Sequence, residues 1–269
     1  MTPPRATPEG VLTIVTLLKR DRAKAMIRAA FPRRRAQLVA IKGAVELDVQ
    51  LTAQLVDAVI IDTGVGEEAG FAIARAEDFQ SIPFVLMTSM LPAEAPLLAR
   101  AAGAGITELL VDGVDDGVAR ELVQRRAFST RFERAMAVAP RELGLETPLQ
   151  MAVWRSVVRR AGRPVRTDQL AQELDVSREH LSRSFAQGTA PTLKRVIDLV
   201  RVLAAAELAK NTGFDVRDVA QILGFASSSH LSSTTQRLVG ARASSLTRLR
   251  AIDLLARFQQ QRPESDETD

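Results

Sequence analysis

The chain of 269 residues is long enough for two ordinary domains, and its apolar content of 46% supports hydrophobic cores and argues against a disordered protein. It contains no cysteine, which excludes disulfides, thiol catalysis and thiolate zinc sites and fits a cytoplasmic protein. Residues 1–153 carry 18 basic and 19 acidic side chains, whereas residues 154–262 carry 18 and 9. A basic block beside a neutral one is typical of a nucleic-acid-binding module joined to another domain, although an arginine-rich composition inherited from a GC-rich genome would give the same excess.

The N-terminal half alternates continuous apolar runs with helical patterns. The apolar runs predict five strands, at 11–18, 36–41, 56–62, 83–88 and 106–111. The helical patterns lie between and after them, at 21–31, 44–55, 71–79, 93–102 and from 117 onward. Continuous apolar strands separated by helices indicate a parallel sheet that is covered on both faces. We therefore predict an α/β domain at 11–139 with a five-stranded, doubly wound sheet.

The boundaries of the remaining segments follow from composition. The last helix of the α/β domain is expected to continue to 139, either as a dimerising or connecting helix or, in its first half, as a helix packed on its own sheet. Residues 140–150, which include PRELGLETP, are the predicted linker. We expect an all-helical domain at 151–258, a flexible N-terminus at 1–10 and a disordered acidic tail at 259–269. The first apolar run is too short to span a membrane.

An internal repeat runs through the C-terminal half. The sequence LAQEL at 170–174 returns as VAQIL at 219–223, offset by 49 residues. The sequence HLS at 180–182 returns at 230–232, offset by 50 residues. The nearly equal offsets predict two copies of one small structural unit.

Each copy predicts two short helices joined by a tight turn. Ser177 in the first copy and Ser227 in the second are natural N-caps for the second helix. Val176 and Phe225 would fill the small core between the paired helices. A helix at 192–210 separates the copies, and it would hold them about one duplex turn (~34 Å) apart, so that both second helices enter successive major grooves.

The segment 165–249 resembles the DNA-binding domain of the AraC/XylS family of transcription regulators. The matching stretches are TDQLAQELDVSREHLSRSF, the connecting helix and DVRDVAQILGFASSSHLSSTTQRLVGARASSLTRL. The run VAQILGF, followed by HLS and then by a glycine and a pair of serines, is the most diagnostic part. The resemblance implies an all-α domain of seven helices that contains two helix-turn-helix units.

The resemblance also implies which side chains contact DNA bases. In the first unit these are Arg178, Glu179, Ser182 and Arg183. In the second unit they are Ser228, Ser229, Ser232 and Ser233. Arg183 could form a bidentate contact with guanine and Glu179 could accept from cytosine, whereas serine is permissive. The family often has a basic residue near Ser233 and a core phenylalanine where Thr235 stands, so we expect the first unit to dominate specificity.

Further basic residues are expected to contact phosphates and to make binding strongly salt-dependent. The candidates are Arg159, Arg160, Arg166, Lys194, Arg195, Arg237 and Arg242. For any single one, a solvated surface charge is an equally good interpretation. His180 and His230 occupy equivalent positions in the two copies, where packing at the helix end or a phosphate contact is a better interpretation than a shared metal site.

The segment 11–127 resembles the receiver domain of response regulators. Asp62 ends the third strand where that family has its phosphoacceptor, and Thr88 matches the hydroxyl residue that senses the phosphoryl group. The acidic pair that binds Mg²⁺ in that family is replaced by Leu18-Lys19-Arg20, and Val111-Asp112-Gly113 stands where that family has a lysine. Phosphorylation of Asp62 is therefore doubtful, and Lys19 or Arg20 is expected to pair with it and hold one conformation. The alternative is that Asp62 is merely a polar strand end.

Taken together, the sequence predicts a transcription regulator that binds specific double-stranded DNA and is controlled by a pseudo-receiver domain. The alternatives are a response regulator phosphorylated at Asp62 and an adaptor that contacts proteins and binds DNA weakly. A homodimer through the α/β domain is expected, and RNA polymerase is a candidate partner. The sequence contains no nucleotide-binding, metalloprotease or serine-hydrolase motif, so no catalytic activity, metal or cofactor is predicted.

Overall fold

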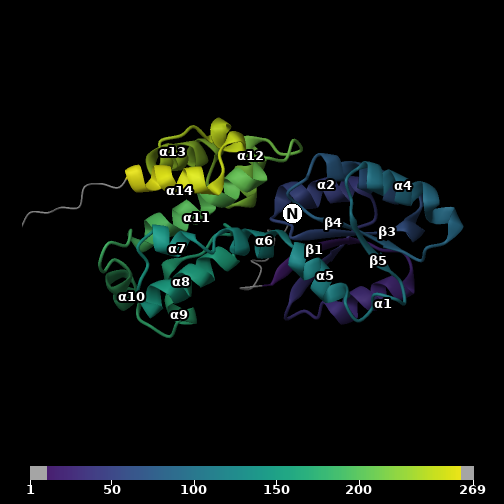
Figure 1. Cartoon of the computed structure of the whole chain (residues 1–269), viewed down its shortest axis with the longest axis horizontal. Helices are drawn as coiled ribbons and strands as arrows, with labels where there is room; N and C mark the ends of the chain where they lie inside the picture. Colours follow the sequence, from purple (N-terminus) through teal and green to yellow (C-terminus); the bar gives the residue numbers. More distant parts are fainter. Residues whose placement is uncertain (1–10, 262–269) are drawn as a thin grey trace, which may run out of the picture. The chain divides into compact units, whose positions relative to one another are not determined.

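The structure is a computed structural model that describes residues 11–261 (Figure 1). The described chain divides into two compact units. The first contains the residues up to Arg131 together with Asn211–Gly213, and the second contains Phe132 to Lys210 and the residues from Phe214 onward. The expected flexible segment 1–10 and residues 262–269 of the expected acidic tail lie outside the described residues.

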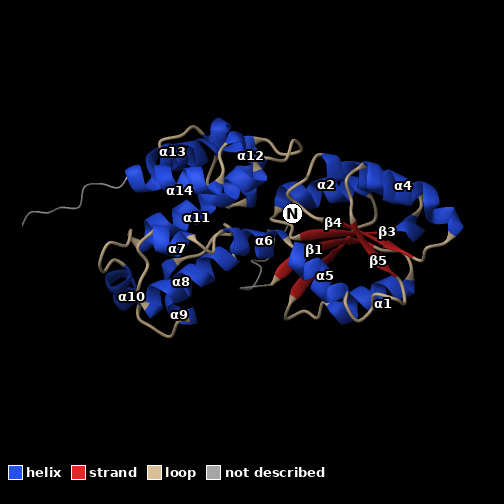
Figure 2. Ribbon diagram, viewed as in Figure 1, coloured by secondary structure: helices blue, strands red, loops and turns tan. Residues whose placement is uncertain are grey.

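The first unit is an α/β fold with one parallel sheet in the order β2-β1-β3-β4-β5 (Figure 2). Its strands are β1 (Leu12–Leu17), β2 (Ala36–Ala40), β3 (Ala58–Asp62), β4 (Phe84–Thr88) and β5 (Glu108–Val111). Its helices are α1 (Asp21–Ala30), α2 (Ala44–Ala53), α3 (Glu67–Ala74), α4 (Ala95–Gly103) and α5 (Ala119–Arg126), with the 3₁₀ turns η1 (Thr63–Val65), η2 (Arg75–Glu77) and η3 (Pro92–Glu94). The predicted five-stranded, doubly wound sheet is confirmed, and its order is that of flavodoxin-like folds.

The sheet is buried because its strands are apolar along their whole length. Every residue of β3 and β4 is buried. On one face, Ile60 and Met87 pack with Ile27 of α1 and Val123 of α5. Helices α2 and α4 cover the opposite face (Figure 2), and α3 contacts both of them. Side chains that follow the carboxyl ends of the strands are thereby brought to one edge of the sheet.

The helix predicted to run from 117 to 139 is interrupted. Helix α5 ends before Ala127, whose ψ of 138° is not helical, and α6 (Phe128–Ala135) begins directly after it. The cause is Asp57, which is fully buried just before β3. Its backbone carbonyl accepts from the Phe128 N–H (2.9 Å), and its carboxylate accepts from the N–H (3.0 Å) and the hydroxyl of Ser129. A buried carboxylate at this point favours a new helix N-terminus over continuation of the old helix.

The second unit is helical. Besides the part of α6 from Phe132 onward, its helices are α7 (Ala139–Glu142), α8 (Pro148–Arg159), α9 (Thr167–Glu173), α10 (Arg178–Phe185), α11 (Leu193–Leu208), α12 (Val216–Ile222), α13 (Ser228–Val239), the 3₁₀ helix η4 (Ala243–Arg248) and α14 (Ala251–Gln260). Helices α8 to α14 are the seven that the resemblance implies. Central helix α11 is buried along most of its length and contacts α8, α12, α13, α14 and η4. Within 11–261, no helix is both long and apolar enough to cross a membrane.

Two segments that we predicted to be irregular are folded. The expected linker at 140–150 contains part of α7 and the start of α8, and Leu143 and Leu145 between them are 2% and 5% exposed. Thr147 caps α8 by accepting from the Gln150 N–H (3.1 Å). Because these leucines are buried, the turn-forming residues around them mark a short turn between packed helices and not an exposed linker. The expected tail from 259 is helical at its start, because α14 continues to residue 260.

The position of Asp57 generates a prediction about stability. Its carboxylate also accepts from the Thr13 N–H (2.8 Å) of β1, so Asp57→Ala would leave buried amides of Thr13 and Ser129 without their acceptor. We expect the free energy of unfolding to fall by about 3 kcal/mol, as for the loss of buried hydrogen bonds to a charged group. Urea denaturation followed by circular dichroism measures this loss.

The matched control for Asp57 is Asp21→Ala. The Asp21 side chain is 98% exposed and pairs with Lys24 on its own helix, so the change should stay within about 0.5 kcal/mol. Equal losses in the two variants would contradict the role assigned to Asp57.

Candidate functional site

The first candidate DNA-reading unit consists of α9 and α10. Between them the chain reverses at Asp175, whose φ of 53° lies in the left-handed region that short polar residues tolerate. The Val176 N–H then donates to the Ala171 carbonyl (3.0 Å), which closes the end of α9. Ser177 starts α10 as its N-cap by accepting from the His180 N–H (3.1 Å).

The second helix-turn-helix unit, which consists of α12 and α13, repeats the hydrogen bonds of this turn and cap. Gly224 takes the left-handed position with a φ of 66°, and the Phe225 N–H donates to the Ala220 carbonyl (2.8 Å). Ser227 caps α13 by accepting from the His230 N–H (3.1 Å). The His230 ring packs edge-on against Phe225 at 5.6 Å, in agreement with the expected packing at the helix end. The repeat seen in the sequence is therefore a structural repeat.

The side chains predicted to read bases from α10 lie on its solvent face. All four are exposed: Arg178, Glu179, Ser182 and Arg183. Leu181 and Phe185 have no exposed surface and fix the opposite face of the helix to the core. Two guanidinium groups and a carboxylate on one face are the donors and the acceptor that distinguish guanine and cytosine in a major groove.

Helix α13 offers only hydroxyl groups at the corresponding positions. Ser229 and Ser233 are exposed, whereas Ser228 and Ser232 are half-buried. Thr235, which stands where the family has a core phenylalanine, is fully buried, and its hydroxyl donates to the Leu231 carbonyl (2.8 Å). Because this hydrogen bond satisfies the hydroxyl of Thr235, threonine can take the place of a larger apolar side chain in the core.

A polar cluster that the sequence did not indicate supports the turn of the second unit. Arg201 of α11 lies 3.8 Å from the centre of the Phe225 ring and donates to the Leu223 carbonyl (3.1 Å). Asp198 lies 3.5 Å from Arg201 and 3.3 Å from Arg237 of α13. Burial lowers the pKa of Arg201 below its ordinary value and outweighs the attraction of Asp198. One acidic side chain thus joins the central helix to the second recognition helix.

The predicted phosphate contacts divide into two groups. Five are exposed: Arg159, Arg166, Lys194, Arg237 and Arg242. Arg160 is paired with Glu173, with only 11% of its side chain exposed, and Arg195 lies 5.0 Å from the centre of the Phe258 ring. Arg160 and Arg195 are engaged within the fold, so the proposal of phosphate contacts rests on the exposed five. Of these, Arg237 also pairs with Asp198 (3.3 Å).

An open hollow of about 390 Å³ lies beside the second recognition helix. It is lined by Ser232 and Gln236 of α13 and by Arg242 and Ser244 at the start of η4. A guanidinium, an amide and two hydroxyls are the donor types that contact DNA phosphates. The structure therefore brings together Ser232 and Arg242, which the sequence proposed separately.

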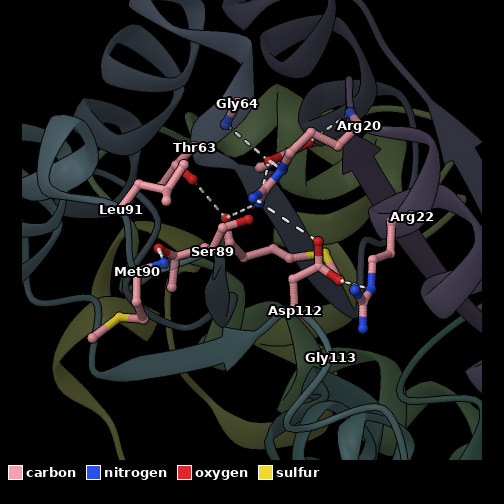
Figure 3. Close-up of polar contacts among 12 residues, drawn as sticks. Arg20, Arg22, Thr63, Gly64, Ser89, Met90, Leu91, Asp112 and Gly113 are labelled. Atoms are coloured by element: carbon pink, nitrogen blue, oxygen red, sulfur yellow. Dashed lines mark hydrogen bonds and ion pairs between the residues drawn. The ribbon is translucent and has the colours of Figure 1, made fainter.

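The carboxyl edge of the sheet carries the second feature of interest (Figure 3). Asp62 is fully buried, and its Oδ2 accepts from the backbone N–H groups of Lys19 (3.0 Å) and Arg20 (2.9 Å). Its Oδ1 accepts from the Gly64 N–H (2.9 Å) and from the Arg20 Nε (2.7 Å), with the Nη2 of Arg20 at 2.6 Å. The expected ion pair to Asp62 is therefore confirmed for Arg20, whereas Lys19 contributes its backbone.

A second buried carboxylate lies next to this ion pair. Glu94, which is 8% exposed, accepts through Oε1 from the hydroxyl of Thr63 (2.6 Å). Its Oε2 accepts from the hydroxyl of Thr88 (2.7 Å) and from the N–H groups of Ser89 and Leu91 (3.0 Å each). Thr88 is thus brought to this edge as predicted, but Glu94 was not among the predicted residues. Its only sequence signal is a position three residues after Leu91, where an acidic side chain can cap a helix start.

Hydrogen bonds and the nearby guanidinium favour the ionised form of Glu94. Burial would raise the pKa of the Glu94 carboxyl, but hydrogen bonds from Thr63, Thr88 and Leu91 and the charge of Arg20 hold it below its ordinary value. Arg20 lies 3.6 Å from Glu94 and 4.0 Å from Asp112, which also pairs with Arg22 (2.9 Å). A single guanidinium therefore lies among three carboxylates. In the part of the chain from 11 to 261, no group of three or more acidic or histidine side chains is arranged to hold a metal ion.

Comparison with known proteins identifies the helical segment. Residues 170–248 match the sequence profile of a family described as a helix-turn-helix domain, which covers less than half of the chain. This segment is a helix-turn-helix domain, and the match supports the resemblance to the AraC-type module. No curated protein matches the chain. Among solved structures, full-length FixJ from B. japonicum matches 79% of this chain and 97% of its own at 12% identity, with a TM-score of 0.36.

The contacts of Arg201 generate a prediction about the second helix-turn-helix unit. Arg201→Met keeps the apolar stem but removes the contacts to Phe225 and to the Leu223 carbonyl. We expect a loss of about 2 kcal/mol in the free energy of unfolding of the helical unit. The fluorescence of Trp154, the only tryptophan of the chain and 3% exposed in α8, reports this unfolding in urea. Arg248→Met, at an exposed arginine of η4, is the control that should change little.

Proposed function

We propose that this chain is a transcription regulator that binds specific sequences of double-stranded DNA through its two helix-turn-helix units. The observation that carries the proposal is the structural repeat, in which a left-handed turn and a serine N-cap recur in both units. The helix-turn-helix profile match supports the same conclusion. The excess of basic residues in 154–262 supplies the attraction to phosphates that such binding needs.

The two units divide the task in this proposal. Helix α10 presents Arg183 and Glu179, whose side chains can form specific contacts with base edges. Helix α13 presents serines, and with Arg242 and Gln236 it borders a hollow whose donors suit a phosphate. The first unit therefore reads the sequence, and the second mainly holds the DNA backbone. RNA polymerase is a candidate partner of the bound regulator.

The α/β unit, in the same proposal, acts without phosphorylation of Asp62. Both oxygens of that carboxylate already accept hydrogen bonds, and Arg20 supplies the positive charge next to it. A phosphoryl donor and Mg²⁺ would have to displace the partly buried guanidinium of Arg20 before either reached Asp62. We further propose that this unit forms a homodimer, which the exposed apolar side chains of Leu109, Val114 and Val118 in the β5–α5 region support.

The division between the units is tested with DNA selected in vitro for binding to the full chain. Arg183→Ala should weaken binding to the selected site about ten- to a hundredfold while leaving binding to random DNA nearly unchanged, because a base contact is lost. Arg242→Ala should weaken both by a similar factor and reduce the salt dependence, because a phosphate contact is lost. Fluorescence anisotropy over a salt series measures both effects, with Arg120→Ala on α5 as the control.

Equal affinity for every sequence in the wild-type chain would refute specific binding and favour the adaptor interpretation. A uniform loss of affinity for both DNAs in Arg183→Ala would refute base reading by the first unit.

The role of Asp62 is tested with a small phosphoryl donor and Mg²⁺. We expect no gain in mass by intact mass spectrometry and no change in sedimentation, with the chain remaining a dimer before and after treatment. A mass gain of one phosphoryl group that disappears in Asp62→Asn would establish the phosphorylated alternative. Sedimentation as a monomer at all concentrations would exclude the homodimer.

A further inference from the structure

Hydrogen-bond donors from several elements converge on the carboxylate of Glu94. Two hydroxyls and two backbone N–H groups point at the two oxygens of one carboxylate, and the Arg20 guanidinium lies 3.6 Å away. We call the donors of Thr63, Thr88, Ser89, Leu91 and Arg20 the anion cradle (Figure 3). Hydrogen bonds from converging donors to a charged acceptor, shielded from water, are the basis of oxyanion recognition in proteins.

A helix-capping role accounts for only part of this arrangement. Capping of η3 requires the contact between Glu94 and the Leu91 N–H, which lies within one turn. The hydroxyl of Thr63 comes instead from η1, and the hydroxyl of Thr88 comes from the end of β4. A capping glutamate is ordinarily a surface side chain, whereas Glu94 is 8% exposed. The side chain therefore fills a site that other elements build.

The loop that carries Glu94 is held in a strained conformation. Met90 has a φ of 57°, in the left-handed region that a side chain such as methionine rarely adopts. Its N–H donates to the Thr88 hydroxyl (2.9 Å), which in turn donates to Glu94. Met90 and Leu91 are each 57% exposed. The contacts of Glu94 are thus what oppose the strain of loop 89–94 and keep two apolar side chains in solvent.

We propose that the anion cradle is a binding site for small oxyanions, of the size of phosphate or acetate, that Glu94 occupies as an intramolecular ligand and thereby holds loop 89–94 in place. Because Glu94 is attached to the site by a few residues of chain, its effective concentration there exceeds that of free anions in solution. The wild-type chain therefore takes no external anion, and removal of the carboxylate exposes the site. The proposal concerns the α/β unit alone and does not depend on DNA binding.

The test uses the full chain with Glu94→Ala, Glu94→Gln and the control Glu121→Ala, at an exposed glutamate of α5. Thermal unfolding is measured at neutral pH in sodium chloride, acetate or phosphate at equal ionic strength. Hydrogen–deuterium exchange of loop 89–94 is measured in the same buffers. Comparison with chloride separates binding in the cradle from general salt effects.

We expect Glu94→Ala to unfold several degrees below the wild type in chloride and to exchange faster in loop 89–94. Acetate or phosphate should raise its unfolding temperature saturably and slow that exchange, because the anion replaces the lost carboxylate. Glu94→Gln should be destabilised but not rescued, since the neutral side chain still fills the space. The wild type and Glu121→Ala should respond no more to these anions than to chloride. Rescue by phosphate only, or by acetate only, identifies the preferred anion geometry.

The proposal is overturned if Glu94→Ala gains nothing from either anion beyond chloride, or if the wild type shows the same saturable stabilisation. Should Glu94→Ala fail to fold in chloride, recovery of its circular dichroism in acetate or phosphate is the equivalent test, and the absence of recovery counts against the proposal. In a second variant, Thr88→Val, the proposal requires faster exchange at loop 89–94 although Glu94 is retained.

Discussion

The ion pair between the half-buried Arg20 and the fully buried Asp62 determines the arrangement at the carboxyl edge of the sheet. Removing either charge from water is unfavourable, and the pair is stable only because backbone N–H groups also bind the carboxylate. The same guanidinium donates to the Met87 carbonyl and lies near Glu94 and Asp112, so it connects loops that follow four different strands. The carboxyl edge of the sheet is therefore closed by the chain's own side chains.

The helical unit also depends on an arginine that is partly withdrawn from water. Arg201 holds the turn of the second helix-turn-helix unit through Phe225, and Asp198 connects it to Arg237. The first unit presents its charged side chains outward on α10 instead. The two copies thus share a backbone geometry but use their charges differently, which supports the proposed division between base reading and anchoring.

Much of this architecture could be predicted from local sequence patterns. Apolar runs predicted the sheet, and the offset repeats predicted both helix-turn-helix units, because periodicity and capping act over a few residues. The break after α5 could not be predicted, because its cause is Asp57, which is distant in sequence and whose burial only the folded sheet creates. The same holds for Glu94, whose hydroxyl partners Thr63 and Thr88 lie at the ends of two different strands. Long-range polar contacts of this kind carry no periodic signal.

The cap that Asp57 provides has a consequence for the order of folding. The carboxylate reaches its place only when β1 and β3 are paired, because it also binds the Thr13 amide. An eight-residue helix such as α6 is too short to persist alone in water, so its start at Phe128 becomes favourable only after that pairing. As the chain leaves the ribosome, the sheet would therefore assemble first and would set the point at which the helical half begins. Synthesis and folding then proceed in the same direction.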